Sequence, residues 1–237
     1  MNSVVFSDQR EANSFNTNYT RPVDIKKLRF IHRHLQLEKP RRLLEFGCGR
    51  GNILMSIVDC EEVVGVEISD TELKKSIALG LNVRSGNARL YKDGQLYDFI
   101  IASEVIEHVL GPEQLLENIV LHLRPRGLLI LTCPNGFGPW EMRKNHLNPM
   151  AYIRRSNAVR RLLGKPPYIK GDSQDHCQWF TMGRIKRLAA ESGLSLIEQQ
   201  NSDCFTGGRL DVKLASRLPA WAASGWFFAF RYSGKTA

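Results

Sequence analysis

Leu43-Leu44-Glu45-Phe46-Gly47-Cys48-Gly49-Arg50-Gly51 is the most informative stretch of this sequence. Its apolar start predicts a strand, and the apolar run 53–58 that follows predicts a helix. Glycines at alternate positions between them permit a sharp turn and let a ligand approach the backbone. The pattern therefore predicts a strand, a tight turn and a helix beside a bound nucleotide.

An acidic residue follows this loop at a distance that suits a ribose. Glu67 comes directly after a second apolar run, Val63–Val66, and lies twenty residues after Gly47. At about this spacing an acidic side chain can accept hydrogen bonds from the hydroxyls of an adenosine ribose. The two patterns together predict an adenosine-containing cofactor.

The residues around the glycines distinguish between cofactors. Dinucleotide-binding loops read Gly-x-Gly-x-x-Gly and direct a helix N-terminus at a pyrophosphate, whereas residues 45–51 read Glu-x-Gly-x-Gly-x-Gly. The Glu45 carboxylate would repel a phosphate but would suit a ligand with an ammonium and a sulfonium group. That ligand is S-adenosylmethionine, and at this point the chain resembles the class I methyltransferases.

The resemblance continues in order along the chain. It covers Val64–Ser69, Gly86–Ala88, Tyr97–Val109 and Leu123–Thr132. The third of these segments is most similar to the branch that contains the ubiquinone-pathway O-methyltransferases. Asn87 replaces the aspartate that the family often has beside the adenine, and its amide can still accept a hydrogen bond from the adenine amino group.

The resemblance implies a cofactor site spread over the ends of several strands. It places the cofactor over the glycine loop, with the Glu67 carboxylate on the ribose hydroxyls. The residues that it assigns to cofactor binding are Glu45, Gly47, Cys48, Gly49, Gly51, Glu67, Ile68, Asn87, Ala88 and Ser103.

Composition and the order of elements favour one domain. The chain has 237 residues, 43% of them hydrophobic, and its expected strands and helices alternate. The resemblance implies an α/β, Rossmann-like sheet of seven mostly parallel strands, with helices on both faces and an antiparallel last strand. Gly225–Tyr232 is the expected last strand, and a membrane segment over 218–230 is the less favoured alternative. We therefore expect a single methyltransferase domain over residues 1–237.

Local signals predict where helices begin and end. Pro22 opens a helix whose apolar residues recur at spacings of three and four, and Ser69 begins a capping box. Thr181 is expected to cap a helix that ends at Gly193. Residues 1–40 are expected to form an N-terminal flap followed by the Pro22 helix.

Residues 134–176 form one long insertion between the fifth strand and the Thr181 helix. Its basic residues are Arg143, Lys144, Arg154, Arg155, Arg160, Arg161, Lys165 and Lys170. Ligands of open α/β sheets bind at the carboxyl ends of the strands, so an insertion that leaves the fifth strand can cover a substrate. We interpret it as a basic lid, with a solvated helical face as the alternative.

Charge and cysteine content restrict the class of partner and the compartment. The formal charge of +9 favours an anionic partner. Five scattered cysteines without C-x-x-C spacing indicate reduced thiols. Because no run of 18 apolar residues occurs and the N-terminus is polar, we expect a cytoplasmic protein without a transmembrane segment or secretory signal.

The segment at the fourth strand supplies candidates for catalysis. If Glu104 begins the helix that follows, then Glu104, Glu107 and His108 share one helical face. The ubiquinone-pathway enzymes and the small-RNA 2′-O-methyltransferases use a similar Glu-x-x-Glu-His set to hold magnesium. We predict Glu104 and His108 as catalytic residues and assign no metal ligand, because three roles stay open for His108: a metal ligand, a metal-free base and a structural residue. His146 or His176, in the insertion or at its exit, could supply a further ligand, with an exposed loop histidine as the alternative.

The favoured function is S-adenosylmethionine-dependent O-methylation of a small-molecule or glycan- or lipid-linked acceptor, with an anionic small molecule as partner. An RNA 2′-O-methyltransferase is the main alternative, although no RNA-binding module accompanies the basic insertion and aromatic stacking residues are few. A NAD(P)-dependent reductase is less favoured, because no tyrosine is followed by a lysine four residues later. A non-catalytic domain that keeps the fold also stays open.

Overall fold

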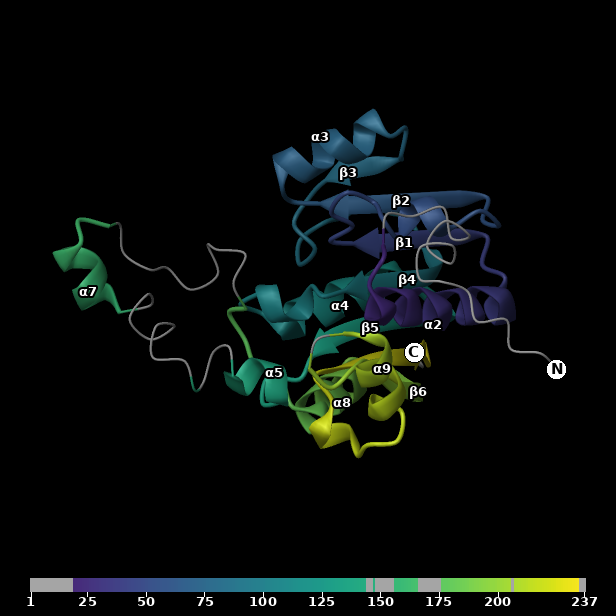
Figure 1. Cartoon of the computed structure of the whole chain (residues 1–237). Helices are drawn as coiled ribbons and strands as arrows, with labels where there is room; N and C mark the ends of the chain where they lie inside the picture. Colours follow the sequence, from purple (N-terminus) through teal and green to yellow (C-terminus); the bar gives the residue numbers. More distant parts are fainter. Residues whose placement is uncertain (1–18, 144–146, 148–155, 166–175, 206, 235–237) are drawn as a thin grey trace.

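The computed structural model describes residues 19–143, 147, 156–165, 176–205 and 207–234. Within these residues, seven strands form one sheet in the order β3-β2-β1-β4-β5-β7-β6 (Figure 1). The strands are β1 (Arg42–Phe46), β2 (Glu62–Glu67), β3 (Val83–Ser85), β4 (Tyr97–Ser103), β5 (Leu123–Pro134), β6 (Leu194–Asn201) and β7 (Gly225–Tyr232). Strands β1 to β5 pair in parallel, whereas β7 pairs antiparallel with both β5 and β6. The predicted fold class is confirmed, including the antiparallel last strand.

Helices cover both faces of the sheet. Successive side chains of a strand point to opposite faces, so Leu43 packs with α2 (Pro22–Glu38) and η1 (Leu54–Ser56), while Leu44 packs with α4 (Pro112–His122) and α8 (Met182–Glu191). The other helical elements are α3 (Asp70–Ala78), η2 (Ile106–His108), α5 (Pro139–Glu141), α7 (Asn157–Leu162), α9 (Arg209–Ala215) and η4 (Ala220–Ala222). This layering leaves the two ends of the sheet, and not its faces, available for ligands.

The helix boundaries predicted from local signals are confirmed. Pro22 is the first residue of α2. The hydroxyls of Ser69 and Thr181 accept hydrogen bonds from backbone N–H groups at the starts of α3 and α8. Gly193, two residues after the end of α8, has a φ of 77°, the left-handed conformation that glycine adopts most readily.

The helix predicted after the glycine loop is wrong. The run 53–58 contains only η1, a single 3-10 turn. Residues 47–61 must contain the loop, this turn and the return to β2, so little room is left for a longer helix. The sequence pattern identified the apolar contacts correctly, since Ile53 and Leu54 are buried, but not the length of the element.

About half of the basic insertion lies outside the described residues. Its described middle, residues 156–165, contains α7, which buries none of its residues and lies away from the sheet (Figure 1). Lys144, His146, Arg154, Arg155 and Lys170 lie outside the described residues, as do residues 1–18 of the flap predicted over residues 1–20. The lid and the flap therefore stay predictions.

The segment considered as a membrane alternative belongs to the sheet. Residues 218–230 contain η4 and most of β7, and Trp226, Phe228 and Phe230 are buried in the core. None of the helices in the described part of the chain is long and apolar enough to cross a membrane. All five cysteines are free thiols.

Candidate active site

The glycine loop turns at the carboxyl end of β1. Gly47, Gly49 and Gly51 have φ angles of 69°, 55° and 78°, which residues with a side chain rarely adopt. A Cβ atom at Gly47 would lie 2.6 Å from the Val105 side chain, whereas a Cβ at Gly49 would meet no atom within 4 Å. The loop therefore packs tightly at its start and opens at its middle glycine, where a ligand can approach the backbone.

The carboxylate of Glu67 is held in place at the end of β2. Its Oε2 accepts a hydrogen bond from the backbone N–H of Gly49 at 2.8 Å, and its Oε1 accepts one from the N–H of Ser69 at 2.8 Å. The side chain is 7% exposed. A carboxylate offers about four lone-pair positions, so two remain for the hydroxyls of a ribose.

Glu45 is buried near the end of β1. Its Oε2 has no hydrogen-bond partner among the described residues. Burial raises the pKa of Glu45 well above its usual value, Glu67 adds to the rise, and Lys27 opposes it. A cationic group of a ligand placed beside Glu45 would favour its ionised form.

The other residues predicted to bind the cofactor lie at the same edge of the sheet. Asn87 and Ala88 follow β3; the Asn87 side-chain oxygen accepts a hydrogen bond from the Arg89 N–H at 3.0 Å. Ser103 ends β4, where its hydroxyl lies 3.0 Å from that of Thr132. Cys48 and Ile68 were also predicted to bind the cofactor; Cys48 is buried and Ile68 is exposed. The structure thus brings the predicted residues to the carboxyl ends of β1 to β4, while their contact with a cofactor stays a prediction.

The predicted helical face of Glu104, Glu107 and His108 does not form. Glu104 has a φ of 57°, which is strained for a residue with a side chain, and η2 begins only at Ile106. Thr132 fixes Glu104 instead: its hydroxyl donates to Glu104 Oε1 at 2.6 Å. Glu104 is therefore oriented from strand β5, not from a helix that it shares with His108.

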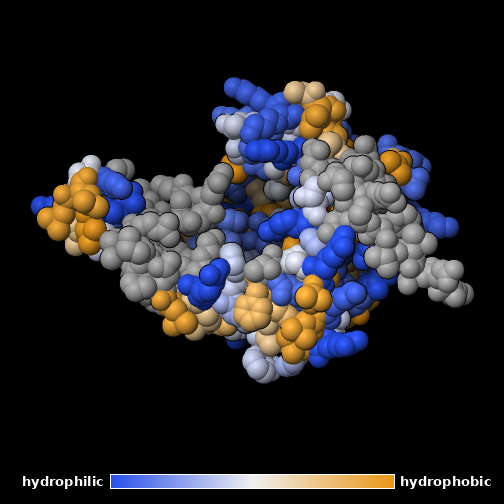
Figure 2. Space-filling view, viewed as in Figure 1, coloured by the Kyte–Doolittle hydropathy of each residue, from blue (hydrophilic) through white to orange (hydrophobic). Residues whose placement is uncertain are grey.

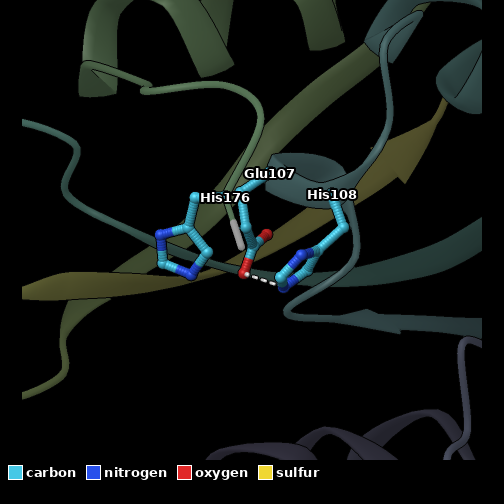
Figure 3. Close-up of side chains that lie close together, drawn as sticks. All are labelled: Glu107, His108 and His176. Atoms are coloured by element: carbon cyan, nitrogen blue, oxygen red, sulfur yellow. Dashed lines mark ion pairs between the residues drawn. The ribbon is translucent and has the colours of Figure 1, made fainter. Parts of the chain in front are cut away.

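A different group of ligand-type side chains forms here. One atom from each of Glu107, His108 and His176 lies within 4.8 Å of the others, and Figure 3 shows the two imidazoles on either side of the Glu107 carboxylate. Glu107 is fully buried, and among the described residues neither of its oxygens meets hydrogen-bond geometry with a partner. Burial, followed by the nearby Glu104 carboxyl, raises the pKa of Glu107 well above its usual value. Glu107 Oε1 does lie 3.8 Å from His108 Nε2, an ion-pair distance if His108 is protonated. A carboxylate and two imidazoles are suitable ligands for a divalent cation, and the lack of hydrogen bonds to the buried Glu107 oxygens agrees with such a role.

A cavity of about 490 Å³ opens beside this group. Its walls come from the start of α2, the end of β5, α5, the segment after β6 and the first residues of β7, which reach the same edge because β7 is antiparallel. Figure 2 shows a hollow in this face of the molecule, between the part that carries α3 and the part that carries α5. Glu104 and His176 line the cavity. It is a space where an acceptor can meet Glu104, one of the two predicted catalytic residues, whereas His108 is not among the residues that line it.

The cavity combines aromatic and charged side chains. The aromatic residues are Trp140, Phe205, Trp226 and Phe227; the charged ones are Arg21, Lys27, Asp24, Glu104, Glu141 and Asp203. The described lining thus has four carboxyl groups and two cations, a balance that does not support an anionic acceptor. The anionic partner stays a prediction that depends on the undescribed part of the insertion.

Lys27 is a residue of this site that the sequence analysis missed. It lies on α2, is 8% exposed and lines the cavity. Burial disfavours its charged form, but Tyr19, Glu104, Asp24 and Glu45 outweigh that effect and raise the pKa of Lys27. Lys27 therefore keeps its charge between the carboxyl groups of Glu45 and Glu104. Nothing in the sequence pattern of this amphipathic helix indicates that the Lys27 side chain is buried beside the cavity.

Comparison with known proteins identifies the family. A sequence model described as a methyltransferase domain matches residues 19–199, which is most of the chain. The chain belongs to this methyltransferase-domain family. Together with the fold and the relatives below, the match makes it a class I S-adenosylmethionine-dependent methyltransferase, and S-adenosylmethionine is its methyl donor.

Curated relatives of the methyltransferase carry the name ubiquinone biosynthesis O-methyltransferase. The protein from Coxiella burnetii is 25% identical over 180 residues, which cover 73% of this chain and 70% of the relative. The protein from Rickettsia canadensis is 23% identical over 163 residues, which cover 66% of this chain and 63% of the relative. The chain thus spans less than two thirds of the Rickettsia protein.

Solved structures share the fold of the methyltransferase. The N-methyltransferase NodS of Bradyrhizobium japonicum, in complex with S-adenosyl-L-homocysteine, matches with a TM-score of 0.59 at 12% identity. That match covers 96% of this chain and 99% of NodS. An S-adenosylmethionine-dependent methyltransferase from Archaeoglobus fulgidus matches with a TM-score of 0.60 at 14% identity, over 86% and 92% of the two chains.

Proposed function

We propose that this methyltransferase transfers the methyl group of S-adenosylmethionine to a hydroxyl oxygen of a small-molecule acceptor. The observation that carries the proposal is the position of Glu104 and the Glu107–His108–His176 group beside the 490 Å³ cavity. Curated relatives named as O-methyltransferases support the choice of oxygen as the acceptor atom. The aromatic side chains of the cavity favour a flat, partly apolar acceptor.

The cofactor would bind over the glycine loop. In this proposal Glu67 accepts hydrogen bonds from the ribose hydroxyls, and Glu45 lies near the ammonium or sulfonium group. Asn87 and Ala88 border the adenine, and Ser103 borders the reacting end. In this proposal the methyl group faces the cavity, because Glu104, the residue directly after β4, lines it.

The reaction is an in-line displacement at the methyl carbon. The acceptor oxygen forms a bond to the methyl carbon while the carbon–sulfur bond breaks. The electron pair of the broken bond stays on sulfur, which becomes a neutral thioether. The chain aligns the two reactants, and this accounts for most of the acceleration. The acceptor hydroxyl must also lose its proton, and the Glu104 carboxylate, oriented by Thr132, takes it.

Glu107, His108 and His176 would hold a divalent cation in this proposal. Such a cation, when bound, lowers the pKa of a hydroxyl that coordinates it. The donor set and the buried Glu107 oxygens, which have no hydrogen-bond partner among the described residues, support this assignment. The sequence suggested Glu104, Glu107 and His108 as a possible metal-binding set. In this proposal His176 takes the place of Glu104, which leaves Glu104 available as the base.

The test is a product analysis with methyl-labelled S-adenosylmethionine. The candidate acceptors are phenols, catechols, amines of similar shape and an RNA fraction, each incubated with the protein in a separate reaction. We expect label in an ether, with one S-adenosylhomocysteine formed for each ether. Label that enters only amines or only RNA would refute O-methylation of a small molecule while leaving the methyltransferase assignment intact.

A further inference from the structure

A buried carboxylate lies behind His176. Glu141 Oε1 is 3.4 Å from His176 Nδ1, and Glu141 is 1% exposed. The two residues come from opposite ends of the insertion: Glu141 ends α5, and His176 lies shortly before α8. The pair therefore joins the two ends of the insertion beside Glu107 and His108.

We infer that Glu141 is a positioning residue that orients His176 as a cation ligand and so sets the affinity of the site for a divalent metal ion. An imidazole that turns Nδ1–H toward a carboxylate leaves the lone pair of Nε2 for a metal. In Figure 3 one ring nitrogen of His176 is directed toward the Glu107 carboxylate. This arrangement fixes both the tautomer and the direction of the ring.

The environment strengthens the interaction between Glu141 and His176. Glu141 is almost completely shielded from water, and His176 is only 20% exposed. In such surroundings a charged hydrogen-bond acceptor attracts an N–H group more strongly than it does in water. The inference rests on the cation site of the proposed function.

The first measurement is the binding of Mn²⁺ to the full chain by calorimetric titration. Replacement of a carboxylate that orients a metal-bound histidine commonly weakens metal binding about 10- to 100-fold, and we expect a loss in this range for Glu141→Gln. His176→Ala removes the ligand and should weaken binding at least as much. Asp203→Asn is the matched control: it removes a carboxylate from the same cavity without changing a partner of His176, and it should retain nearly all affinity.

The second measurement separates orientation from folding. In the metal-free protein, nitrogen-15 NMR of the His176 ring should show the Nδ1–H tautomer in the wild type. Glu141→Leu removes the acceptor and should move the ring toward the Nε2–H tautomer that unrestrained histidine favours. Thermal unfolding in EDTA identifies any variant that does not fold, and Glu141→Gln, which preserves shape, keeps the inference testable if Glu141→Leu fails.

The inference is overturned if Glu141→Gln binds Mn²⁺ as tightly as the wild type, or if the tautomer of His176 does not change in Glu141→Leu. A wild-type protein that binds no Mn²⁺ would overturn the cation site and the role of Glu141 together. Label transfer to an ether in the product analysis would still support O-methylation in that case. The two failures are therefore distinguishable.

Discussion

Glu67 Oε2 accepts a hydrogen bond from the backbone N–H of Gly49 at 2.8 Å. Gly49 is the middle glycine of the loop after β1, and Glu67 is the last residue of the neighbouring strand β2. The bond therefore makes the loop and the carboxylate one unit. Because the carboxylate is already oriented, a ligand that binds here loses little free energy to ordering it.

Glu67→Ala should weaken the binding of S-adenosylmethionine by about 1.5–3 kcal/mol, because hydrogen bonds to a charged group are lost. Calorimetric titration of the cofactor measures this change. Glu62→Gln is the control, since Glu62 lies at the other end of β2 and pairs with Arg42. Equal affinities in the wild type and Glu67→Ala would show that the residue does not contact the cofactor.

Glu104→Gln should reduce kcat by about 100-fold or more, with little change in the KM for S-adenosylmethionine, because a general base typically contributes 10²–10⁴-fold. Steady-state kinetics with an accepted hydroxyl substrate provide the measurement. Thr132→Val should give a smaller reduction, since it removes only the hydroxyl that orients Glu104. A kcat that is unchanged in Glu104→Gln would assign proton removal to another group.

Removal of divalent cations should abolish most of the turnover. Turnover should be lost in EDTA and should return when Mg²⁺ or Mn²⁺ is added back, because Glu107, His108 and His176 would then bind a cation again. The measurement is kcat before chelation, after it and after each metal is added back. Full turnover in EDTA would leave His108 as a metal-free residue of the site.

The salt dependence of kcat/KM should be shallow. The cavity has a mixed lining of four carboxyl groups and two cations, and a small acceptor contacts few charges. An RNA substrate would instead give a steep dependence, with a slope of about −0.7 for each phosphate neutralised on a single strand. Arg160→Ala combined with Arg161→Ala tests the insertion, and Lys186→Ala combined with Arg187→Ala on α8 is the control. A steep slope that becomes shallow only in the α7 variant would favour RNA.

The Glu38–Arg231 ion pair should contribute to stability only above acidic pH. Arg231 donates two hydrogen bonds to the Glu38 carboxylate, at 2.6 and 2.7 Å, and these lower the pKa of Glu38. A carboxyl whose pKa is lower in the folded state stabilises that state above its unfolded pKa of about 4.3, and this contribution disappears as the pH falls through the folded pKa. Glu38→Gln should therefore cost about 0.5–1 kcal/mol at pH 7 and almost nothing at pH 3, a modest value because both side chains are partly exposed.

Urea unfolding at the two pH values checks this prediction. Glu61→Gln is the control, because the Arg41–Glu61 pair is largely exposed and should not contribute measurably. A cost of Glu38→Gln that is equal at pH 3 and pH 7 would assign the effect to packing rather than to charge.

The parts of the fold that depend on neighbouring residues could be predicted from the sequence. Pro22, Ser69 and Thr181 act within one helical turn, so their patterns identify α2, α3 and α8 without knowledge of the rest of the chain. Gly225–Tyr232 was predicted with its observed bounds, because a strand covered on both faces is apolar throughout. The positions of the glycine loop and Glu67 also follow from the local sequence, since both belong to the short segment that joins β1, the 3-10 turn η1 and β2.

The rest of the candidate site depends on contacts between distant segments. The φ of 57° at Glu104 is imposed by its surroundings, which include the hydrogen bonds to Thr132, and it removes Glu104 from the helix that the spacing suggested. His176 joins Glu107 and His108 from the far end of the insertion. Neither position leaves a periodic pattern in the sequence, so this candidate group could be predicted only in part.

The central position of β7 has a consequence for the order of assembly. The ribosome makes β7 after the other six strands, yet this strand must enter between β5 and β6. Gly225, Trp226 and Phe227 at its start also form part of the cavity wall. During synthesis the cofactor loop and Glu67 can fold early, whereas the acceptor cavity cannot be complete until the last strand has inserted. A nascent chain can therefore form the glycine loop and Glu67 before the cavity at the other strands is closed, and that cavity gains its full wall only after β7 has inserted.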